Sequence, residues 1–279
     1  MYQLESRQRR VESHPWQPTS FVRPDQQSAE MVDHLIDFAT TVASARSAVF
    51  FWAGPQCEIL APQCLNIRED ALGAYTECVG QQDPLHISRL RERQSRIAVL
   101  SQHQRQYSVS LDSEYKTHLA SIHVGDEVVL VFWRGREPLA CLSLLRTPRQ
   151  RPFSLDGFDW HSLRSFVQAS LNFHWRVRSM NVEHLLTYRF GLKPRELEVV
   201  RYILFGKSNS QIAEILGIGI PTVKTHIVSI LNKTGVDSRL GIACFVHGLE
   251  IPQSNSFAYQ SDAPGSSHKS AIDATPVWS

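Results

Sequence analysis

The sequence predicts an α+β domain followed by an all-α domain of four helices. Two strongly β-prone runs, residues 127–134 and 139–146, follow each other across a short turn. Apolar residues recur at helical spacing on both sides of this pair. After residue 185 only helical spacing remains, and Gly217 interrupts it where two short helices would meet. At 279 residues, the chain is long enough for two such domains.

Composition excludes several classes of protein. A hydrophobic content of 42% and a charged content of 20% are typical of a soluble globular protein. There is no run of 18 apolar residues, so we expect no membrane span. The five cysteines form no Cys-x-x-Cys pair and the first ten residues lack an apolar core, which predicts reduced thiols and a cytoplasmic location. Because metal-ligand spacings and catalytic or phosphate-binding motifs are missing, we expect no metal, no cofactor, no catalytic residue and no enzymatic activity.

Composition and patterning also divide the chain into four segments. Residues 1–27 and 252–279 are polar and rich in Ser and Pro, which predicts disordered tails. Residues 28–183 are expected to form the α+β domain and residues 185–251 the helical one. The helical segment holds eight basic and five acidic residues, whereas residues 1–184 are balanced. This modest positive excess favours nucleic-acid binding by more than one copy of the chain.

The α+β domain is expected to begin with an amphipathic helix, because Met31, Leu35, Phe38 and Val42 recur at helical spacing. The remaining elements follow from β-prone runs, helical periodicity and Gly or Pro punctuation. We predict strands at 48–53, 57–61 and 122–124, helices at 71–79 and 88–100, a hairpin of 127–134 with 139–146, and one long helix over 156–178.

The four helices after residue 185 have recognisable start and stop signals. Pro194 stands at a first helical position, and Gly206 ends that helix. Ser208 or Asn209 caps the second helix, which Gly217 ends. The third helix starts near Pro221 and the fourth at Ser238. The spacing of a small residue (Ala213), Gly217 and an apolar anchor (Val223) predicts a helix-turn-helix.

Five short segments of this region resemble the C-terminal DNA-binding domain of the LuxR family of bacterial transcription regulators. They are residues 192–196, 209–213, 216–218, 222–226 and 235–239. Lys193 departs from the family pattern, because threonine usually occupies that place and caps the first helix. Losing this cap costs about 1 kcal/mol. A sigma-factor type of helix-turn-helix is the alternative within the DNA-binding class.

The resemblance implies double-stranded DNA as a partner, a homodimer, and RNA polymerase as a further candidate partner. Lys224 is expected to meet a guanine edge or a phosphate, and Thr225 and Val228 are expected to meet base edges. The side chains expected at phosphates are those of Thr222, Lys233, Ser210 and Gln211. A different class of function stays open, in which the N-terminal domain binds a ligand or acts as an enzyme and the helix-turn-helix contacts another protein.

The order of elements in residues 28–183 resembles a GAF-like or PAS-like sensory domain, or the autoinducer domain of LuxR-type receptors. Such a domain implies a small-molecule effector. Tyr75 and Asp83-Pro84 resemble the ligand-pocket motif of acyl-homoserine-lactone receptors, in which an aspartate accepts from the ligand amide. The alternative for these two residues is structural, with Asp83 as a helix cap and Tyr75 in the core.

Overall fold

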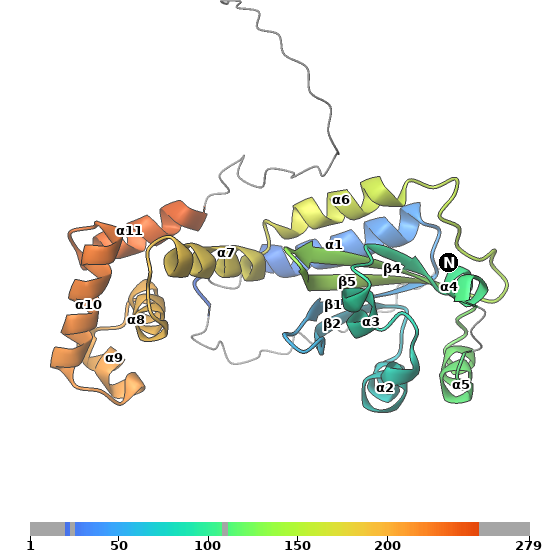
Figure 1. Ribbon diagram of the computed structural model, residues 1–279, viewed down its shortest axis with the longest axis horizontal. Helices are drawn as coiled ribbons and strands as arrows, with labels where there is room; N and C mark the ends of the chain where they lie inside the picture. The colour runs from blue at the N-terminus through green and yellow to red at the C-terminus, as the bar shows by residue number, and fades with distance from the viewer. Residues whose placement is uncertain (1–19, 23–25, 108–110, 251–279) are drawn as a thin grey trace, which may run out of the picture.

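The computed structural model describes residues 20–22, 26–107 and 111–250, which form two lobes joined along one helix, α7 (Figure 1). One lobe contains a sheet with helices on both faces, and the other is entirely helical. The predicted fold class, α+β followed by four helices, is therefore confirmed. Most of the two predicted tails, namely residues 1–19, 23–25 and 252–279, lies outside the described residues.

Five antiparallel strands form the sheet, in the order β2-β1-β5-β4-β3. Their bounds are β1 Ser47–Ala53, β2 Ile59–Leu65, β3 Ile97–Val99, β4 Asp126–Arg134 and β5 Glu137–Arg146. The predicted hairpin is β4–β5. Arg134 pairs with Glu137, so a two-residue turn joins the strands. Gly135 occupies this turn at φ 63°, a conformation that glycine adopts without strain.

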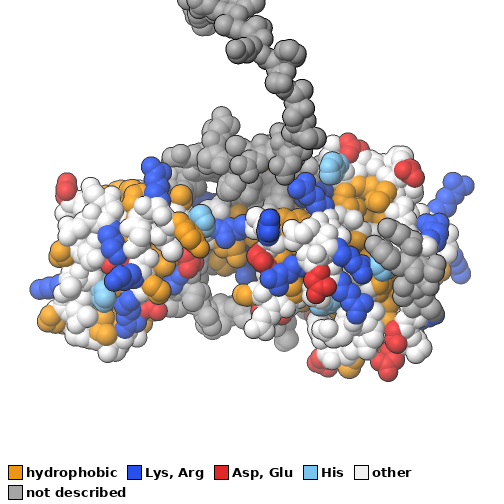
Figure 2. All heavy atoms as spheres, in the orientation of Figure 1, with side chains coloured by type: hydrophobic (Ala, Val, Ile, Leu, Met, Phe, Trp, Pro, Cys, Tyr) orange, Lys and Arg blue, Asp and Glu red, His pale blue; other side chains and the backbone are white. Residues whose placement is uncertain are grey.

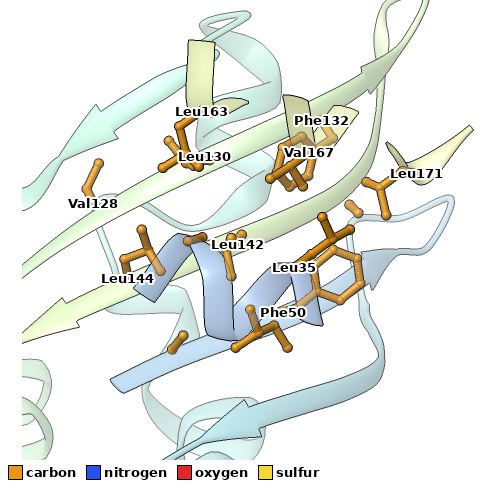
Figure 3. Packing of buried hydrophobic residues seen from close by; sticks show 14 of the residues in the cluster. Leu35, Phe50, Val128, Leu130, Phe132, Leu142, Leu144, Leu163, Val167 and Leu171 are labelled. Carbon is orange, nitrogen blue, oxygen red and sulfur yellow. The ribbon is translucent and has the colours of Figure 1, made fainter. Parts of the chain in front are cut away.

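Helices α1 (Gln26–Val42) and α6 (Trp160–Leu171) cover one face of the sheet (Figure 1). Alternate residues of the central strands point into this layer, as the strand period of two requires. Figure 3 shows Phe50, Leu130 and Leu142 of the sheet packed against Leu35 of α1 and Val167 of α6. These residues are buried and form the first core.

Short helices cover the opposite face of the sheet. They are α2 (Glu69–Ala74), a π-helical turn (Tyr75–Val79), a 3-10 turn (Gly80–Gln82), α3 (Ile87–Glu92), α4 (Leu100–Tyr107) and α5 (Ser113–Ser121). The second core lies here, built on the other alternate residues of the strands, such as Phe51, Val129 and Cys141. Several polar side chains are buried on this face as well, and they border a cavity.

The second lobe consists of α7 (Trp175–Tyr188), α8 (Pro194–Leu204), α9 (Asn209–Leu216), α10 (Ile220–Thr234) and α11 (Arg239–Glu250). Its starts and stops agree with the sequence signals. Pro194 opens α8, Ser208 caps α9, and the Ser238 hydroxyl accepts from the Gly241 N–H at 3.0 Å at the start of α11. Val200, Ile212, Val223 and Ile230 are buried in the core of this lobe.

The predicted long helix over 156–178 is wrong, because the chain breaks between α6 and α7. His174 is 3% exposed, and its ring packs on Trp52 of β1 with ring centroids 4.6 Å apart. Its Nδ1 accepts from the Arg176 N–H at 3.1 Å and caps a new helix. A histidine held in this way starts α7 in a new direction.

Two more of the predicted elements differ. Residues 122–124 form no strand, because the N–H groups of Ile122, His123 and Val124 bond back to carbonyls of α5. The predicted helix over 88–100 ends at Glu92, and residues 97–99 pair with β4 instead. The partner of residues 97–99 is distant in sequence, so periodicity along the chain does not reveal it. The partners of residues 122–124 are carbonyls in the last turn of the preceding helix, which turn the chain instead of extending it.

Smaller differences concern bounds and helix faces. Strand β2 begins two residues after the predicted position 57 and reaches Leu65, and the helix predicted over 71–79 is α2 with its π-helical continuation. The buried face of α1 carries Val32 and Ala39, whereas Phe38 and Val42 of the predicted stripe are 44% and 40% exposed. Helix α1 is therefore rotated away from the predicted face.

Helix α7 runs through the predicted domain boundary at residues 183–185. Val177 near its start is buried in the sheet lobe, and Val182 and Leu186 are buried in the helical lobe. Part of the predicted 1–27 tail packs on the same helix. Phe21 is 2% exposed, its N–H donates to Ser179 Oγ at 2.8 Å, and the Arg201 guanidinium lies 4.7 Å from its ring centroid.

Within the part of the chain that the structure describes, no single helix is long and apolar enough to cross a membrane. The bent pair α9–α10 reaches the required length and composition only when its two arms are taken together.

Candidate nucleic-acid interface and ligand pocket

The turn between α9 and α10 is built from local hydrogen bonds. Ser208 Oγ accepts from the Gln211 N–H at 3.3 Å, and Gln211 Oε1 accepts from the Ser208 N–H at 2.9 Å, so a reciprocal cap starts α9. At its other end Gly217 adopts φ 62° and ψ 36°, and the Ile218 N–H bonds back to Ala213 at 3.0 Å. The two helices consequently meet with a bend of 108°.

Helix α10 has one buried and one exposed face. Val223 and Ile230 are fully buried and anchor the helix on α8 and α9. On the opposite side Lys224 and Thr225 are exposed, and Val228 is 55% exposed. An exposed valine beside a lysine and a threonine forms a mixed polar and apolar strip. Such a strip offers a cation, a hydroxyl and methyl groups to whatever binds there.

The structure brings most of the predicted DNA-contacting residues to the surface. Thr222 is exposed in the first turn of α10, and Ser210 and Gln211 are exposed in the first turn of α9. The Thr225 hydroxyl donates to the Pro221 carbonyl at 3.1 Å, which fixes its rotamer and leaves its methyl group available for contact. Ser210 Oγ lies 2.9 Å from Ser208 Oγ, within the cap of α9.

Lys233 is placed differently from the prediction. Its ammonium donates to Glu196 Oε2 at 2.6 Å and to the Gly191 carbonyl at 2.9 Å, so it is bound within the domain. Glu196 is 4% exposed and also accepts from Ser229 Oγ at 2.6 Å and from the Lys193 N–H at 2.7 Å. The hydrogen bonds of Lys233, Ser229 and Glu196 tie the start of α8 to the end of α10. Lys233 could bind a phosphate only if its bonds to Glu196 and Gly191 were broken.

Electrostatics supports a structural role for Glu196. Burial acts to raise the pKa of its carboxyl, but the hydrogen bonds from Lys193, Lys233 and Ser229 outweigh burial and lower the pKa. The carboxylate also accepts from the Lys193 N–H, which is one half of a capping box, and the Glu196 N–H bonds to the Lys193 carbonyl at 2.9 Å. The predicted loss of a cap at this position is therefore partly offset.

Sequence reasoning missed two arginines that hold the helices together. Arg195 donates to Glu198 and to the Leu216 carbonyl, both at 2.6 Å, and thereby joins α8 to the end of α9. Arg239 at the start of α11 donates to Asn209 Oδ1 at 2.9 Å and to the Lys207 carbonyl. The available signal was the free carbonyls near helix ends, which arginine commonly satisfies.

A cavity of about 70 Å³ lies between the sheet and the short helices of the N-terminal lobe. Its apolar wall consists of Val49, Phe51, Ile59, Ile67, Ala71, Leu72, Leu119, Ile122 and Leu145. Its polar wall consists of Tyr75, Tyr115, His118, Glu127 and Ser143. An apolar cavity with a few converging polar groups is the usual form of a small-molecule site.

The predicted pair Tyr75 and Asp83 is brought together at this cavity. The Tyr75 hydroxyl donates to Asp83 Oδ2 at 2.6 Å, and the Leu85 N–H donates to Asp83 Oδ1 at 2.7 Å. Tyr75 lines the cavity, whereas Asp83 is 3% exposed and lies behind it. Burial raises the pKa of Asp83, and the hydrogen bonds from Tyr75, Leu85 and Tyr115 oppose that rise.

Glu127, Tyr115, His118 and Ser143 at the cavity were not predicted. Glu127 is 7% exposed, and burial together with the nearby Asp83 raises its pKa to about 8, although Ser143 and Tyr115 hydrogen-bond to it. In the sequence Glu127 only opens a β-prone run, so it has the pattern of a solvent-exposed strand end. Its burial depends on strand pairing and on Tyr115 of α5.

Comparisons with known proteins found matches to bacterial transcription regulators in the helical lobe. The model of the family "Bacterial regulatory proteins, luxR family" matches residues 191–246. The transcriptional regulatory protein LiaR of Bacillus subtilis (strain 168) is 48% identical over 57 residues, which are 20% of this chain and 27% of LiaR. The nitrate/nitrite response regulator protein NarP of Escherichia coli (strain K12) is 47% identical over 49 residues, which are 18% of this chain and 23% of NarP. The chain thus spans about a quarter of the length of the curated relatives it matches.

Solved structures with some likeness include Escherichia coli SdiA, with 18% identity and a TM-score of 0.43, covering 81% of this chain and 93% of that one. The VqsR LBD domain from Pseudomonas aeruginosa has 17% identity and a TM-score of 0.38, covering 54% of this chain and 96% of that one. The assignment rests on the matched segment, its capped and bent helix pair, and the agreement between the family model and residues 191–246. Residues 191–246 therefore form a helix-turn-helix domain of the luxR family of bacterial regulatory proteins.

Proposed function

We propose that this protein is a transcription regulator that binds double-stranded DNA by placing α10 in the major groove. The observation that carries the proposal is the division of α10 into two faces. Val223 and Ile230 fix one face to the domain, and Lys224, Thr225 and Val228 are exposed on the other. A helix set at 108° to its partner can enter a groove while the partner stays above the backbone.

Each exposed residue of α10 has a role that fits its chemistry. Lys224 meets a guanine edge or a phosphate, and the methyl groups of Thr225 and Val228 contact thymine methyls. Thr222 lies at the start of α10, where the N-cap Gly219 supplies no side-chain acceptor. The N–H groups of Ile220 and Thr222 would bind a phosphate there, since Pro221 has no N–H and the Val223 N–H bonds to the Gly219 carbonyl. Ser210 and Gln211 contact the backbone from the start of α9, and Lys233 keeps its structural role.

Two copies of the chain would bind together. Figure 2 shows Lys and Arg side chains scattered over both lobes on the visible face, so a single helical lobe has no concentrated basic surface there. We propose that the two copies pair through the sheet lobe. Phe38 and Phe166 are 44% and 52% exposed, and their ring centroids lie 5.2 Å apart across α1 and α6. Exposed aromatic pairs of this kind are typical of contact surfaces.

The N-terminal lobe would act as the regulatory part. Its cavity offers a partly open, mostly apolar site for a small-molecule effector, with Tyr75 in its polar wall and Asp83 behind Tyr75. Helix α7 packs in the cores of both lobes, through Val177 in the sheet lobe and Val182 and Leu186 in the helical lobe. It is the element through which a change in the sheet would reach the DNA-binding lobe. The effector would change how the two copies pair, and thereby their affinity for DNA.

A gel-shift assay with the full chain and its own upstream DNA, at two salt concentrations, tests the proposal. Binding should weaken as salt rises. The variant Lys224→Ala should bind specific DNA more weakly by about 1–3 kcal/mol, which is roughly 5-fold to 150-fold in affinity. Lys116→Ala is the matched control, because it removes one charge from an exposed helix of the other lobe.

Equal affinities of the Lys224 variant and the unmodified protein would reject the role of that lysine. If the chain binds no DNA at either salt concentration, the proposal fails. In that case the helix-turn-helix would be assigned to protein interaction.

A further inference from the structure

The cavity of the N-terminal lobe has a buried acidic side chain in its wall and, among the described residues that line it, no basic side chain of lysine or arginine to balance it. One buried carboxyl group, that of Glu127, lines its polar end, and a second, that of Asp83, lies behind Tyr75. Carboxyl groups taken out of water are unfavourable unless a cation or several donors compensate them. A site with this composition suits a ligand that brings the missing positive charge.

We propose that this cavity binds a small organic amine as its cation, with the ammonium group at Glu127 and an apolar body against the sheet. The inference rests on the proposed function, because it names the chemical class of the effector. It assigns Glu127 and Ser143 of the two central strands as specificity-determining residues. Tyr75 belongs to the same polar wall, and Asp83 supports this tyrosine from behind by accepting from its hydroxyl.

The contrast between Glu127 and its neighbour Asp126 supports this assignment. The two residues follow each other in β4, so their side chains point to opposite faces of the sheet. Asp126 accepts from the Ser101 N–H at 2.9 Å, from Ser101 Oγ at 2.9 Å and from the Phe153 N–H at 2.7 Å. Three donors, two of them fixed in the backbone, make Asp126 a structural carboxylate.

Glu127 has a different environment. Its hydrogen-bonding neighbours Tyr115 and Ser143 contribute hydroxyl groups, which rotate and both donate and accept. It is also a cavity-lining residue, whereas Asp126 is not. A buried carboxyl that lines the cavity and accepts from adaptable hydroxyl groups is suited to exchange partners. Asp126 is thus hydrogen-bonded within the protein, whereas Glu127 lines the cavity in which a ligand would bind.

The protonation state of the site agrees with this role. Burial and the adjacent Asp83 raise the pKa of Glu127 to about 8, so its carboxyl holds a proton at neutral pH when no cation is present. His118 at the cavity wall does not supply the missing charge, because burial lowers its pKa despite the opposing effect of Asp83. Tyr75 and Tyr115 stay neutral, since burial raises the pKa of both. An incoming ammonium group therefore replaces a proton.

Size and shape restrict the ligand further. A volume of about 70 Å³ corresponds to roughly five water-sized groups, since one water needs about 10–15 Å³ by this measure. Branched aliphatic and aromatic side chains form the rest of the wall, among them Phe51, Ile59 and Leu72. A short branched or aromatic primary amine matches both the volume and the lining.

Isothermal titration calorimetry of the full chain at pH 7 tests the proposal with isosteric probes. Isoamylamine and benzylamine are compared with the alcohols and carboxylic acids of the same carbon skeletons. We expect the amines to bind at least about tenfold more tightly than their alcohols, and the acids not to bind. Titrations in two buffers of different ionisation enthalpy should show the release of about one proton per amine bound.

The variant Glu127→Gln should bind the amines at least about tenfold more weakly and release no proton. Glu114→Gln, on the exposed start of α5 in the same lobe, is the matched control for the change in charge. The proton release by the unmodified protein needs no variant, so the test stands even if a substitution impairs folding. Equal binding of amines and alcohols, tighter binding of the acids, or full amine binding by Glu127→Gln would each overturn the proposal.

The two proposals fail separately. The gel-shift assay is performed without and with isoamylamine, so absence of DNA binding under both conditions rejects the regulator and leaves the calorimetry to decide on the cavity. If DNA binding is normal and the amines show none of the expected preference, the regulator stands and the effector class is wrong. An amine that both binds through Glu127 and changes the affinity for DNA would support both proposals.

Discussion

Replacing Gly217 by alanine isolates the backbone energy of the turn on which the helix-turn-helix depends. At φ 62° and ψ 36° the residue is in the left-handed region, and a Cβ added there would meet no heavy atom within 4 Å. The cost is therefore conformational rather than steric, about 1–2 kcal/mol for an L-residue in this region. Gly217→Asn should cost less, because asparagine tolerates the left-handed conformation better.

Gly248→Ala is the matched control for this substitution. Gly248 lies inside α11 with a φ outside the positive range, and its added Cβ also meets nothing within 4 Å. There alanine should stabilise the helix by about 0.5–1 kcal/mol. The same substitution, glycine to alanine, is thus expected to lower the stability of the lobe at position 217 and to raise it at position 248.

Hydrogen exchange of the backbone amides of α8–α11 in the full chain measures both effects in the lobe that contains the substitutions. Protection factors report the local free energy of opening, which should fall for Gly217→Ala and rise for Gly248→Ala. Equal signs at the two positions would refute the reasoning. A loss above about 3 kcal/mol at Gly217 would also contradict it, since the backbone term alone does not reach that size.

Three further predictions concern other parts of the fold. Glu196→Gln should destabilise the helical lobe by about 1.5–3 kcal/mol in urea unfolding, because it removes a charged acceptor. The exposed Glu198→Gln should cost under about 1 kcal/mol, and equal losses would deny the special role of Glu196. The raised pKa of Glu127, about 8 against an ordinary 4.5, means that the folded state holds a proton that the unfolded state releases. Its contribution is complete below pH 4.5 and is lost as pH rises through 8, so stability without ligand should fall across this window by up to about 1.4 kcal/mol per pH unit. Glu127→Gln should remove that slope, and an unchanged slope would reject the assignment. Replacing both Phe38 and Phe166 by serine should shift the protein from dimer to monomer in sedimentation velocity, and an unaltered sedimentation coefficient would place the pairing surface elsewhere.

The helix-turn-helix was predictable from sequence because its determinants are close together in the chain. Ser208 and Gln211 cap each other three residues apart, and Ile218 bonds back to Ala213 across Gly217. Such contacts leave a fixed spacing of residue types. The family model over residues 191–246 confirms the prediction drawn from that spacing.

The missed features depend on partners that are distant in sequence. Lys233 bonds to Glu196, 37 residues away, and nothing local distinguishes it from a lysine that faces DNA. Phe38 and Ala39 are both compatible with the apolar face of α1, and only packing on the sheet buries the second and exposes the first. The polar wall of the cavity follows the same rule, because Glu127 reaches it only through the pairing of β4 and the position of Tyr115.

Helix α7 makes the two lobes torsionally dependent on each other. Val177 is fixed in one core and Leu186 in the other, and Arg134 at the end of β4 donates to the Met180 carbonyl at 3.2 Å between them. Each residue of an α-helix advances by about 1.5 Å and turns by about 100°. The number of residues between the two anchors therefore sets the azimuth of the recognition helix relative to the sheet. Adding or deleting one residue there would turn α10 relative to the sheet by more than a quarter of a revolution.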